Sequence, residues 1–317
     1  MEPPISQSTE SSANFTLVPT APAGFRSGFV ALVGRPNVGK STLLNALVGQ
    51  KLAITSPIAQ TTRNRLQGIV TLPHAQMILV DTPGIHKPHH RLGEVLVQNA
   101  RAAMQAVDVV VLVVDGAVVA GKGDRFIANL VAPNTPAVVC CNKQDLIAGE
   151  CEQLEASYRE LLPQASLASV SALKKQSLPS LLDAISALLP VGPYYYPPDA
   201  VTDQPERFII GELIREQILH HTRDEVPHAV AIAVERVEET PQLTRIGATI
   251  TVERASQKGI IIGKKGAMLK TIGSTARRHI QKLIAGKVYL ELFVRVRPRW
   301  RQSKTLLEEF GYRVESE

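Results

Sequence analysis

Aromatic side chains, cysteines and long apolar runs are all scarce in this sequence. Aromatic residues make up 4% of the 317 residues, so the 44% apolar content must build its cores from aliphatic side chains. The three cysteines (Cys140, Cys141 and Cys151) do not have metal-ligand spacing, and we interpret the two in an apolar run as buried thiols of a reducing compartment. Histidines at 86–90 have no partnering Cys or carboxylate set and are interpreted as solvated. No apolar run approaches the ~20 residues that a membrane-spanning helix requires.

Basic residues are absent before Arg26, and residues 1–27 contain no apolar core of a signal peptide. The segment is rich in Pro, Ser, Thr and Ala without periodicity, which predicts a disordered tail. Without secretion or transit signals, we expect a cytoplasmic protein.

Acidic residues are nearly absent between Ser256 and Lys304. This block contains 13 Lys or Arg and one acid, Glu291, for a local net charge of +12. Because the whole chain carries +6, the rest of it carries −6. Such a block favours a polyanionic partner, although charge alone is also consistent with a solvated basic face.

The most informative stretch is GRPNVGKS at 34–41, which fits the phosphate-loop pattern G-x-x-x-x-G-K-[ST]. The apolar run 29–33 before it predicts a buried strand, and 42–48 after it predicts a helix. Glycines let the backbone curl around a phosphate, and the helix N-terminus adds unpaired N–H groups. Lys40 is expected to reach the β- and γ-phosphates and Ser41 to ligate Mg²⁺. The stretch predicts a nucleotide phosphate site.

A second motif, DTPG at 81–84, ends a predicted strand at 76–80 that follows another at 66–72. A carboxylate at the carboxyl end of a strand lies at the binding edge of an open α/β sheet. There Asp81 could hold Mg²⁺, directly or through water, and the Gly84 N–H could contact the γ-phosphate. The polar loop before these strands offers Thr61 and Thr62, and either could close over the γ-phosphate.

A third motif, NKQD at 142–145, follows a strand-like run at 137–141. Asp145 can accept hydrogen bonds from a purine ring N–H and from a 2-amino group, and only guanine offers both. Lys143 can lay its aliphatic stem along the ring, and Asn142 can tie this loop to the phosphate loop. The backbone of SAL at 171–173, after a predicted strand at 166–170, could reach the guanine O6.

A Pro-rich segment, 191–205, separates these motifs from a second pattern of elements. We predict a linker there and expect the tyrosines at 194–196 to pack between the domains, a stacking platform being the alternative. Beyond it the periodicity predicts a helix at 206–221 and two strands at 229–237 and 246–254. Two helices follow, the second ending at 284, and a last strand is predicted at 288–296. The two later helices flank the turn GKKG at 263–266.

In this order the first-half motifs resemble the translation-factor-like class of small GTPases. The Pro-Asn of the phosphate loop, with QTTR at 60–63, resembles the Era, EngA and MnmE group. In that group the Asn, here Asn37, is associated with K⁺ coordination, and the family pattern favours Thr62 over Thr61 as the Mg²⁺ ligand. Ile85 stands where Ras-like proteins carry a water-orienting Gln, which excludes a Gln-based mechanism.

The resemblance implies a set of site residues. Catalytic roles fall to Lys40, Thr62 and Gly84, and metal ligation falls to Ser41, Thr62 and Asp81. Nucleotide binding is implied for Gly34, Arg35, Pro36, Asn37, Val38, Gly39, Lys40, Ser41, Thr42, Asp81, Thr82, Pro83, Gly84, Ile85, Asn142, Lys143, Gln144, Asp145, Ser171, Ala172 and Leu173.

The second half resembles a KH RNA-binding domain in its prokaryotic order. A KH domain clamps the backbone of about four nucleotides with its GXXG loop and takes unstacked bases in the adjacent groove. Here the implied RNA-binding residues are Gly259, Ile260, Ile261, Ile262, Gly263, Lys264, Lys265 and Gly266, with the isoleucines as the apolar side. Trp300 is either a further stacking residue or a core residue.

The predicted fold is α/β: a P-loop GTPase domain with a doubly wound, mostly parallel sheet at 28–190, the linker at 191–205, and a smaller α+β type II KH domain with a C-terminal helix at 206–317. This combination resembles the Era family of ribosome-assembly GTPases. The resemblance implies Mg²⁺-dependent GTP hydrolysis to GDP by a monomer, binding near the 3′ end of small-subunit ribosomal RNA during small ribosomal subunit assembly, and peripheral association with the inner face of the cell membrane.

Two other classes of function remain open. One is a membrane-surface regulatory GTPase whose basic domain binds anionic lipid instead of RNA. The other is an RNA-binding module with a degenerate nucleotide site, which is disfavoured by the full complement Lys40, Ser41, Asp81, Asn142 and Asp145.

Overall fold

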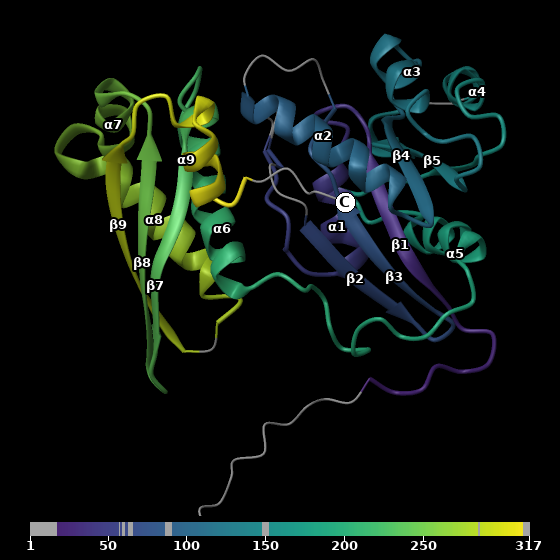
Figure 1. Ribbon diagram of the computed structural model, residues 1–317, viewed down its shortest axis with the longest axis horizontal. Helices are drawn as coiled ribbons and strands as arrows, with labels where there is room; N and C mark the ends of the chain where they lie inside the picture. The colour runs from purple at the N-terminus through teal and green to yellow at the C-terminus, as the bar shows by residue number, and fades with distance from the viewer. Residues whose placement is uncertain are drawn as a thin grey trace, which may run out of the picture.

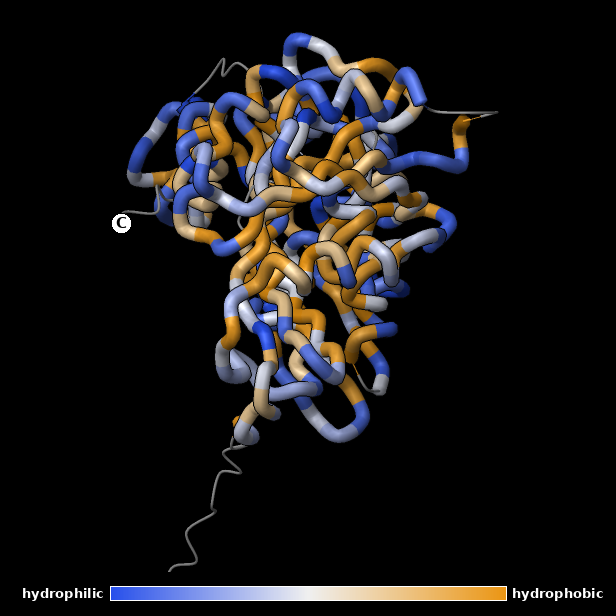
Figure 2. Tube along the Cα trace, turned by 90° about the vertical axis from the view of Figure 1, so that its right-hand side faces the viewer, coloured by the Kyte–Doolittle hydropathy of each residue, from blue (hydrophilic) through white to orange (hydrophobic). Residues whose placement is uncertain are grey.

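The computed structural model describes residues 18–56, 58, 61–62, 66–85, 91–147, 152–284 and 286–312. Within them the chain forms two domains that lie side by side (Figure 1). Apolar positions gather towards the inside of the trace and polar ones towards its periphery (Figure 2). Several residues of the sequence predictions lie outside the described ranges: most of the N-terminal tail, Gln60, Arg63, His86, His89, His90 and Cys151.

The first domain contains a six-stranded sheet in the order β2-β3-β1-β4-β5-β6. Its pairs are parallel except for the antiparallel pair of β2 and β3. The strands are β1 (Arg26–Val33), β2 (Leu66–Leu72), β3 (Ala75–Asp81), β4 (Val109–Asp115), β5 (Ala137–Asn142) and β6 (Ser166–Ser169). The helices are α1 (Lys40–Val48), α2 (Arg91–Gln105), α3 (Lys122–Ala128), α4 (Glu152–Arg159) and α5 (Leu178–Leu188).

Separate apolar cores lie on the two faces of this sheet, as a doubly wound fold requires. Residues of α1 and α5 pack in one core, and residues of α2, α3 and α4 pack in the other. The central strand β4, VVVLVVD, is buried along almost its whole length, so its β-branched side chains serve both cores. The predicted α/β fold is confirmed, and the carboxyl ends of β1, β3, β4 and β5 meet at one edge.

The tyrosine-containing segment of the linker packs on the first domain. The Gly192 N–H donates to the Phe25 carbonyl at 3.0 Å. Ring centroids of Tyr194 and Phe25 lie 4.4 Å apart, and those of Tyr195 and Phe29 lie 5.3 Å apart. The expectation of tyrosines between the domains is therefore wrong, because Phe25 and the amino end of β1 offer them aromatic partners.

The second domain contains a three-stranded sheet, β7-β8-β9, with an antiparallel and a parallel pair. Helices on one face pack over an apolar core. The elements follow the predicted order: α6 (Glu206–His221), β7 (Ala231–Glu239), β8 (Leu243–Val252), α7 (Ala255–Ile262), α8 (Ala267–Ile280) and β9 (Lys287–Val296). A short helix, α9 (Lys304–Glu309), is the last helix of the described chain. The predicted α+β domain is confirmed.

An apolar cluster joins the domains: Leu92 and Leu96 of α2 pack with Trp300, Leu307 and Tyr312. Trp300 is fully buried and its Nε1 donates to the Ala229 carbonyl at 2.9 Å. Of the two predicted roles for this residue, the structure supports the core role. No helix among the described residues is long and apolar enough to span a bilayer.

Candidate nucleotide-binding site

The phosphate loop connects β1 to α1 and needs both of its glycines. Gly34 has φ 156° and Gly39 has φ 98°. A Cβ on Gly34 would lie 2.2 Å from the Val113 carbonyl oxygen, and one on Gly39 would lie 2.3 Å from Nδ2 of Asn142. The loop therefore packs its backbone tightly against β4 and β5, with the N-terminus of α1 at the binding edge.

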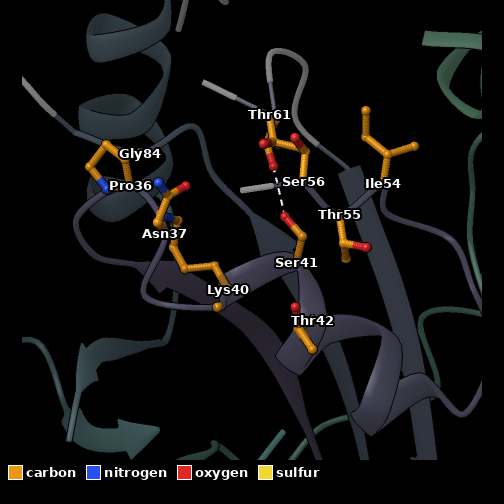
Figure 3. A pocket seen from close by; sticks show the side chains of 12 residues that line it. Pro36, Asn37, Lys40, Ser41, Thr42, Ile54, Thr55, Ser56, Thr61 and Gly84 are labelled. Carbon is orange, nitrogen blue, oxygen red and sulfur yellow. Dashed lines mark hydrogen bonds between the residues drawn. The ribbon is translucent and has the colours of Figure 1, made fainter. Parts of the chain in front are cut away.

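Lys40 opens α1 and is 6% exposed. Its Nζ donates to the carbonyls of Gly34 at 3.1 Å and Arg35 at 3.0 Å, so the ammonium group lies inside the curl of the loop. Burial lowers the pKa of Lys40 to about 8, and the nearby Asp81 carboxylate partly opposes the shift. Figure 3 shows Lys40 and Ser41 facing the same pocket as Asn37, Thr61 and Gly84.

The lowered pKa of Lys40 predicts a proton linkage. A bound phosphate favours the charged amine and so raises its pKa above about 8. Nucleotide binding at pH 9 should therefore take up close to one proton, whereas at pH 6.5 the amine is already charged and uptake through it should be negligible. Affinity should accordingly fall as the pH rises from 8 to 10. Calorimetry in two buffers of different ionisation enthalpy measures the uptake, and zero uptake at pH 9 contradicts the assignment.

Three predicted metal ligands meet beside Lys40. Ser41 Oγ donates to Asp81 Oδ2 at 2.7 Å, Thr62 Oγ1 donates to the same oxygen at 3.0 Å, and the two hydroxyls are 2.8 Å apart. The Asp81 side chain is buried, and its Oδ1 has no hydrogen-bond partner among the residues that the structure describes. Burial raises the pKa of Asp81, against the opposing effect of Lys40. A buried carboxylate with an unsatisfied oxygen, flanked by two hydroxyls, fits the all-oxygen coordination of Mg²⁺.

The choice between the two threonines follows from their hydroxyl partners. Thr61 Oγ1 donates to the Ile58 carbonyl at 2.6 Å, away from the carboxylate. Thr62 Oγ1 contacts both Ser41 and Asp81. Of these two threonines, Thr62 is the one whose hydroxyl contacts Ser41 and Asp81, and it remains our predicted metal ligand.

The base-recognition motif is tied to the phosphate loop through Asn142. Its Nδ2 donates to the Val38 carbonyl at 2.9 Å, and its Oδ1 accepts from the Ala172 N–H at 3.0 Å. One side chain therefore joins three motifs, as expected for Asn142. Asp145 accepts a hydrogen bond from Ser171 Oγ, which orients its carboxylate.

A cavity of about 520 Å³ extends from the phosphate loop to this motif, a volume typical of small-molecule sites. Lys143 on its wall has φ 69°, and its Nζ pairs with Asp115 Oδ2 at 2.7 Å. Sequence reasoning missed Asp115, although it ends β4 in register with Asn142. It also missed other wall residues, namely Ile54, Thr55, Ser56, Leu146 and, from the second domain, His220.

Some predicted nucleotide-binding residues turn their side chains elsewhere. Ile85 is 3% exposed and packs in the core beneath α2, Thr82 Oγ1 donates to the Leu32 carbonyl, and Arg35 pairs with Asp124 at 2.8 Å. These three residues can serve a nucleotide only through their backbone.

The predicted RNA clamp forms the turn between α7 and α8. Gly263 and Gly266 have φ 70° and 80°, and a Cβ on Gly263 would approach the Met268 nitrogen to 2.9 Å. Lys264 and Lys265 are exposed at its tip. Ile260 is 47% exposed, but Ile261 is fully buried. Consecutive residues of a helix point about 100° apart, so three isoleucines of α7 cannot all face a groove, and Ile261 belongs to the core instead.

These features define a P-loop GTPase domain joined to a KH domain. Residues 29–143 match the family model "50S ribosome-binding GTPase", and residues 225–301 match the family model "KH domain". The chain belongs to the GTPase Era family. It is 63% identical to GTPase Era of Nostoc sp. (strain PCC 7120 / SAG 25.82 / UTEX 2576), over 94% of this chain and 93% of the relative, and 62% identical to that of Synechocystis sp. (strain ATCC 27184 / PCC 6803 / Kazusa), over 96% and 98%.

Two solved structures are similar over nearly the whole chain. One is an Aquifex aeolicus Era variant bound to GDP·AlF4⁻, with 37% identity, and the other is Era with MgGDPNP and nucleotides 1506–1542 of 16S ribosomal RNA, with 38% identity. Each gives a TM-score of 0.87 and covers 91% of this chain and 99% of the solved one. The predicted family and both predicted domains are confirmed.

Proposed function

We propose that this protein hydrolyses GTP with Mg²⁺ and binds the 3′ region of small-subunit ribosomal RNA through its KH domain during small-subunit assembly. The observation that carries the proposal is the meeting of Ser41, Thr62 and the half-satisfied Asp81 beside Lys40. The similar Era structure contains both MgGDPNP and 16S ribosomal RNA, which supports the pairing of the two activities.

The side chains of the site divide the work on the nucleotide. Ser41, Thr62 and Asp81 would hold Mg²⁺, which would supply positive charge to the phosphates. Lys40 places a buried ammonium against the phosphates, where low dielectric strengthens its effect. The Gly84 N–H is the proposed donor to the γ-phosphate, at the rim of the same pocket.

Guanine selection by Asp145 can be tested by exchanging its carboxylate for an amide. Asp145→Asn should weaken GTP binding by roughly 10- to 100-fold, since hydrogen bonds to a charged group contribute about 1.5–3 kcal/mol. It should shift preference towards xanthosine triphosphate, because Asn offers a donor to the xanthine carbonyl where Asp accepted from the guanine amino group. Competition binding with the two nucleotides measures the shift. Wild-type GTP affinity without xanthine binding would remove Asp145 from the base site.

We further propose K⁺ as a second ion beside the phosphates, with Asn37 as a ligand. Asn37 lines both parts of the nucleotide cavity and has φ 64°. Hydrolysis should therefore be faster in KCl than in NaCl, because an added positive charge stabilises the transition state. Asn37→Gly keeps the left-handed backbone and removes the amide, so its rates in the two salts should be equal. Equal wild-type rates would count directly against K⁺.

For the second domain we propose RNA as the main partner, with the monomer also associating peripherally with the inner face of the cell membrane. The +12 block supports either polyanion, and anionic lipid as the main partner is the alternative. Binding of a labelled 3′-end fragment of small-subunit ribosomal RNA should be displaced by the unlabelled single strand more effectively than by duplex RNA or by vesicles containing phosphatidylserine. Stronger displacement by the vesicles would favour the lipid alternative.

A further inference from the structure

Helix α6, the first element of the second domain, lies on the side of that domain that faces the first domain (Figure 1). Its residues from Ile209 to Leu219 are almost all buried, although several carry charge. Arg215 and Glu216 are each 1% exposed, and both reach across to the loop between α1 and β2. That loop also supplies the nucleotide cavity with Thr55, Ser56, Thr61 and Thr62.

Glu216 holds the first part of this loop. Its Oε1 accepts from the Thr55 N–H at 2.9 Å and from Thr55 Oγ1 at 3.4 Å, while its Oε2 pairs with Lys51. A buried carboxylate without partners raises the free energy of the folded state, so the contacts of Glu216 stabilise one conformation of the segment 51–55. Thr55 lines the phosphate pocket and the adjoining base cavity, so the contacts of Glu216 with Thr55 help to set the shape of both.

Arg215 holds the second part. Its guanidinium donates to the Thr61 carbonyl and is kept in place by Glu212 of the same helix. Thr61 directly precedes Thr62, whose hydroxyl meets Ser41 and Asp81. The metal-ligand set is thereby connected to α6 through a single peptide unit.

His220 lies four residues after Glu216, on the same face of α6. It lines the 520 Å³ cavity together with the base-recognition residues Lys143 and Asp145. Unlike Glu216, His220 is solvent-exposed. A nucleoside bound in this cavity therefore lies against residues of both domains.

We propose that α6 is a wall of the guanine-nucleotide site, with Glu216 as a positioning residue for the loop 51–56 and His220 as a direct contact to the nucleoside. Release of the nucleotide then requires α6 to move away, so the second domain sets how long the nucleotide stays bound. The inference rests on the proposed binding of guanine nucleotides to this cavity.

The test is the dissociation rate of fluorescently labelled GDP from the full-length protein, chased with excess GDP. Glu216→Ala should release GDP roughly 10-fold faster or more, because the loop loses hydrogen bonds to a charged acceptor. His220→Ala should accelerate release by roughly 2- to 10-fold. The matched control is His221→Ala, which changes the neighbouring exposed histidine outside the cavity and should leave the rate unchanged.

The Glu216→Gln variant tests the positioning role of Glu216 with a smaller change to the buried side chain than Glu216→Ala. Its amide keeps an oxygen acceptor for the Thr55 N–H but loses the ion pair with Lys51, so its release rate should fall between those of wild type and Glu216→Ala. If Glu216→Ala unfolds, the His220 and Gln variants still decide the question. Release rates equal to wild type in both of them overturn the inference. If wild type itself fails to bind labelled GDP, the proposed function is what fails.

Discussion

Replacing Lys40 by alanine is expected to lower the rate of GTP hydrolysis by roughly 100- to 1000-fold, the usual loss when one preorganised electrostatic donor is removed from an active site. The ammonium is buried inside the phosphate loop and donates to two of its carbonyls, so the alanine variant leaves the curl of the loop without the positive charge that Lys40 supplies. Single-turnover hydrolysis at saturating Mg²⁺, measured with binding of GTP by the same preparation, separates the chemical step from affinity.

Two further variants make this result interpretable. Lys40→Met keeps the buried aliphatic stem without the charge, and it should be as slow as the alanine variant if charge is what matters. Lys122→Ala removes an exposed lysine at the start of α3 and should hydrolyse GTP at the wild-type rate. Wild-type turnover of both Lys40 variants would remove the phosphate loop from the active site.

Reversing the charge of the GKKG turn should abolish most RNA binding. Lys264→Asp with Lys265→Asp replaces two exposed cations and leaves both glycines, and Asp tolerates the φ of 51° at position 265. About two phosphate contacts are lost. The slope of log affinity against log salt should therefore become shallower by roughly 1.4, given about 0.7 per phosphate on single strands. Binding of the ribosomal RNA 3′-end fragment across a salt series measures this slope.

The first domain offers a matched control. Lys174 and Lys175 are also consecutive exposed lysines, and Lys175 has φ 55°, so their change to Asp repeats the same charge reversal in the same backbone geometry. That double variant should keep the wild-type salt slope. GTP affinity of the GKKG variant should be nearly unchanged, because the turn does not line the nucleotide cavity. Unchanged RNA affinity would refute the clamp, and loss of both activities would indicate misfolding or a fused interdomain site.

The nucleotide-site motifs were predictable from the sequence because each one lies at the end of a β-strand or directly after it. The phosphate loop follows β1, Asp81 ends β3 and Asn142 ends β5, and parallel strands bring those ends to one edge. The contact between Glu216 and Thr55 joins residues 161 positions apart in the chain. The sequence of α6 does not predict this contact, because the residues around Glu216 do not indicate which distant group its carboxylate contacts.

Other departures have equally specific causes. Three adjacent isoleucines suggested one apolar surface, but the helical twist sends Ile261 inward. The Pro-rich stretch suggested a linker whose tyrosines pack between the domains, yet Gln76 of β3 donates to the Tyr196 carbonyl at 2.9 Å and accepts from the Tyr195 N–H at 2.8 Å. The linker thus packs on the first domain, and α6 meets the nucleotide cavity near its C-terminal end, at His220.

The packing of Trp300 has a spectroscopic consequence. It is the chain's single tryptophan, fully buried, stacked near Tyr312 at 5.9 Å and packed with Leu92 and Leu96 of the first domain. Its indole fluorescence therefore reports on one place, the apolar cluster that must be disrupted when the two domains separate. Entry of water there shifts indole emission to longer wavelength, so the unlabelled protein carries its own optical gauge of domain separation.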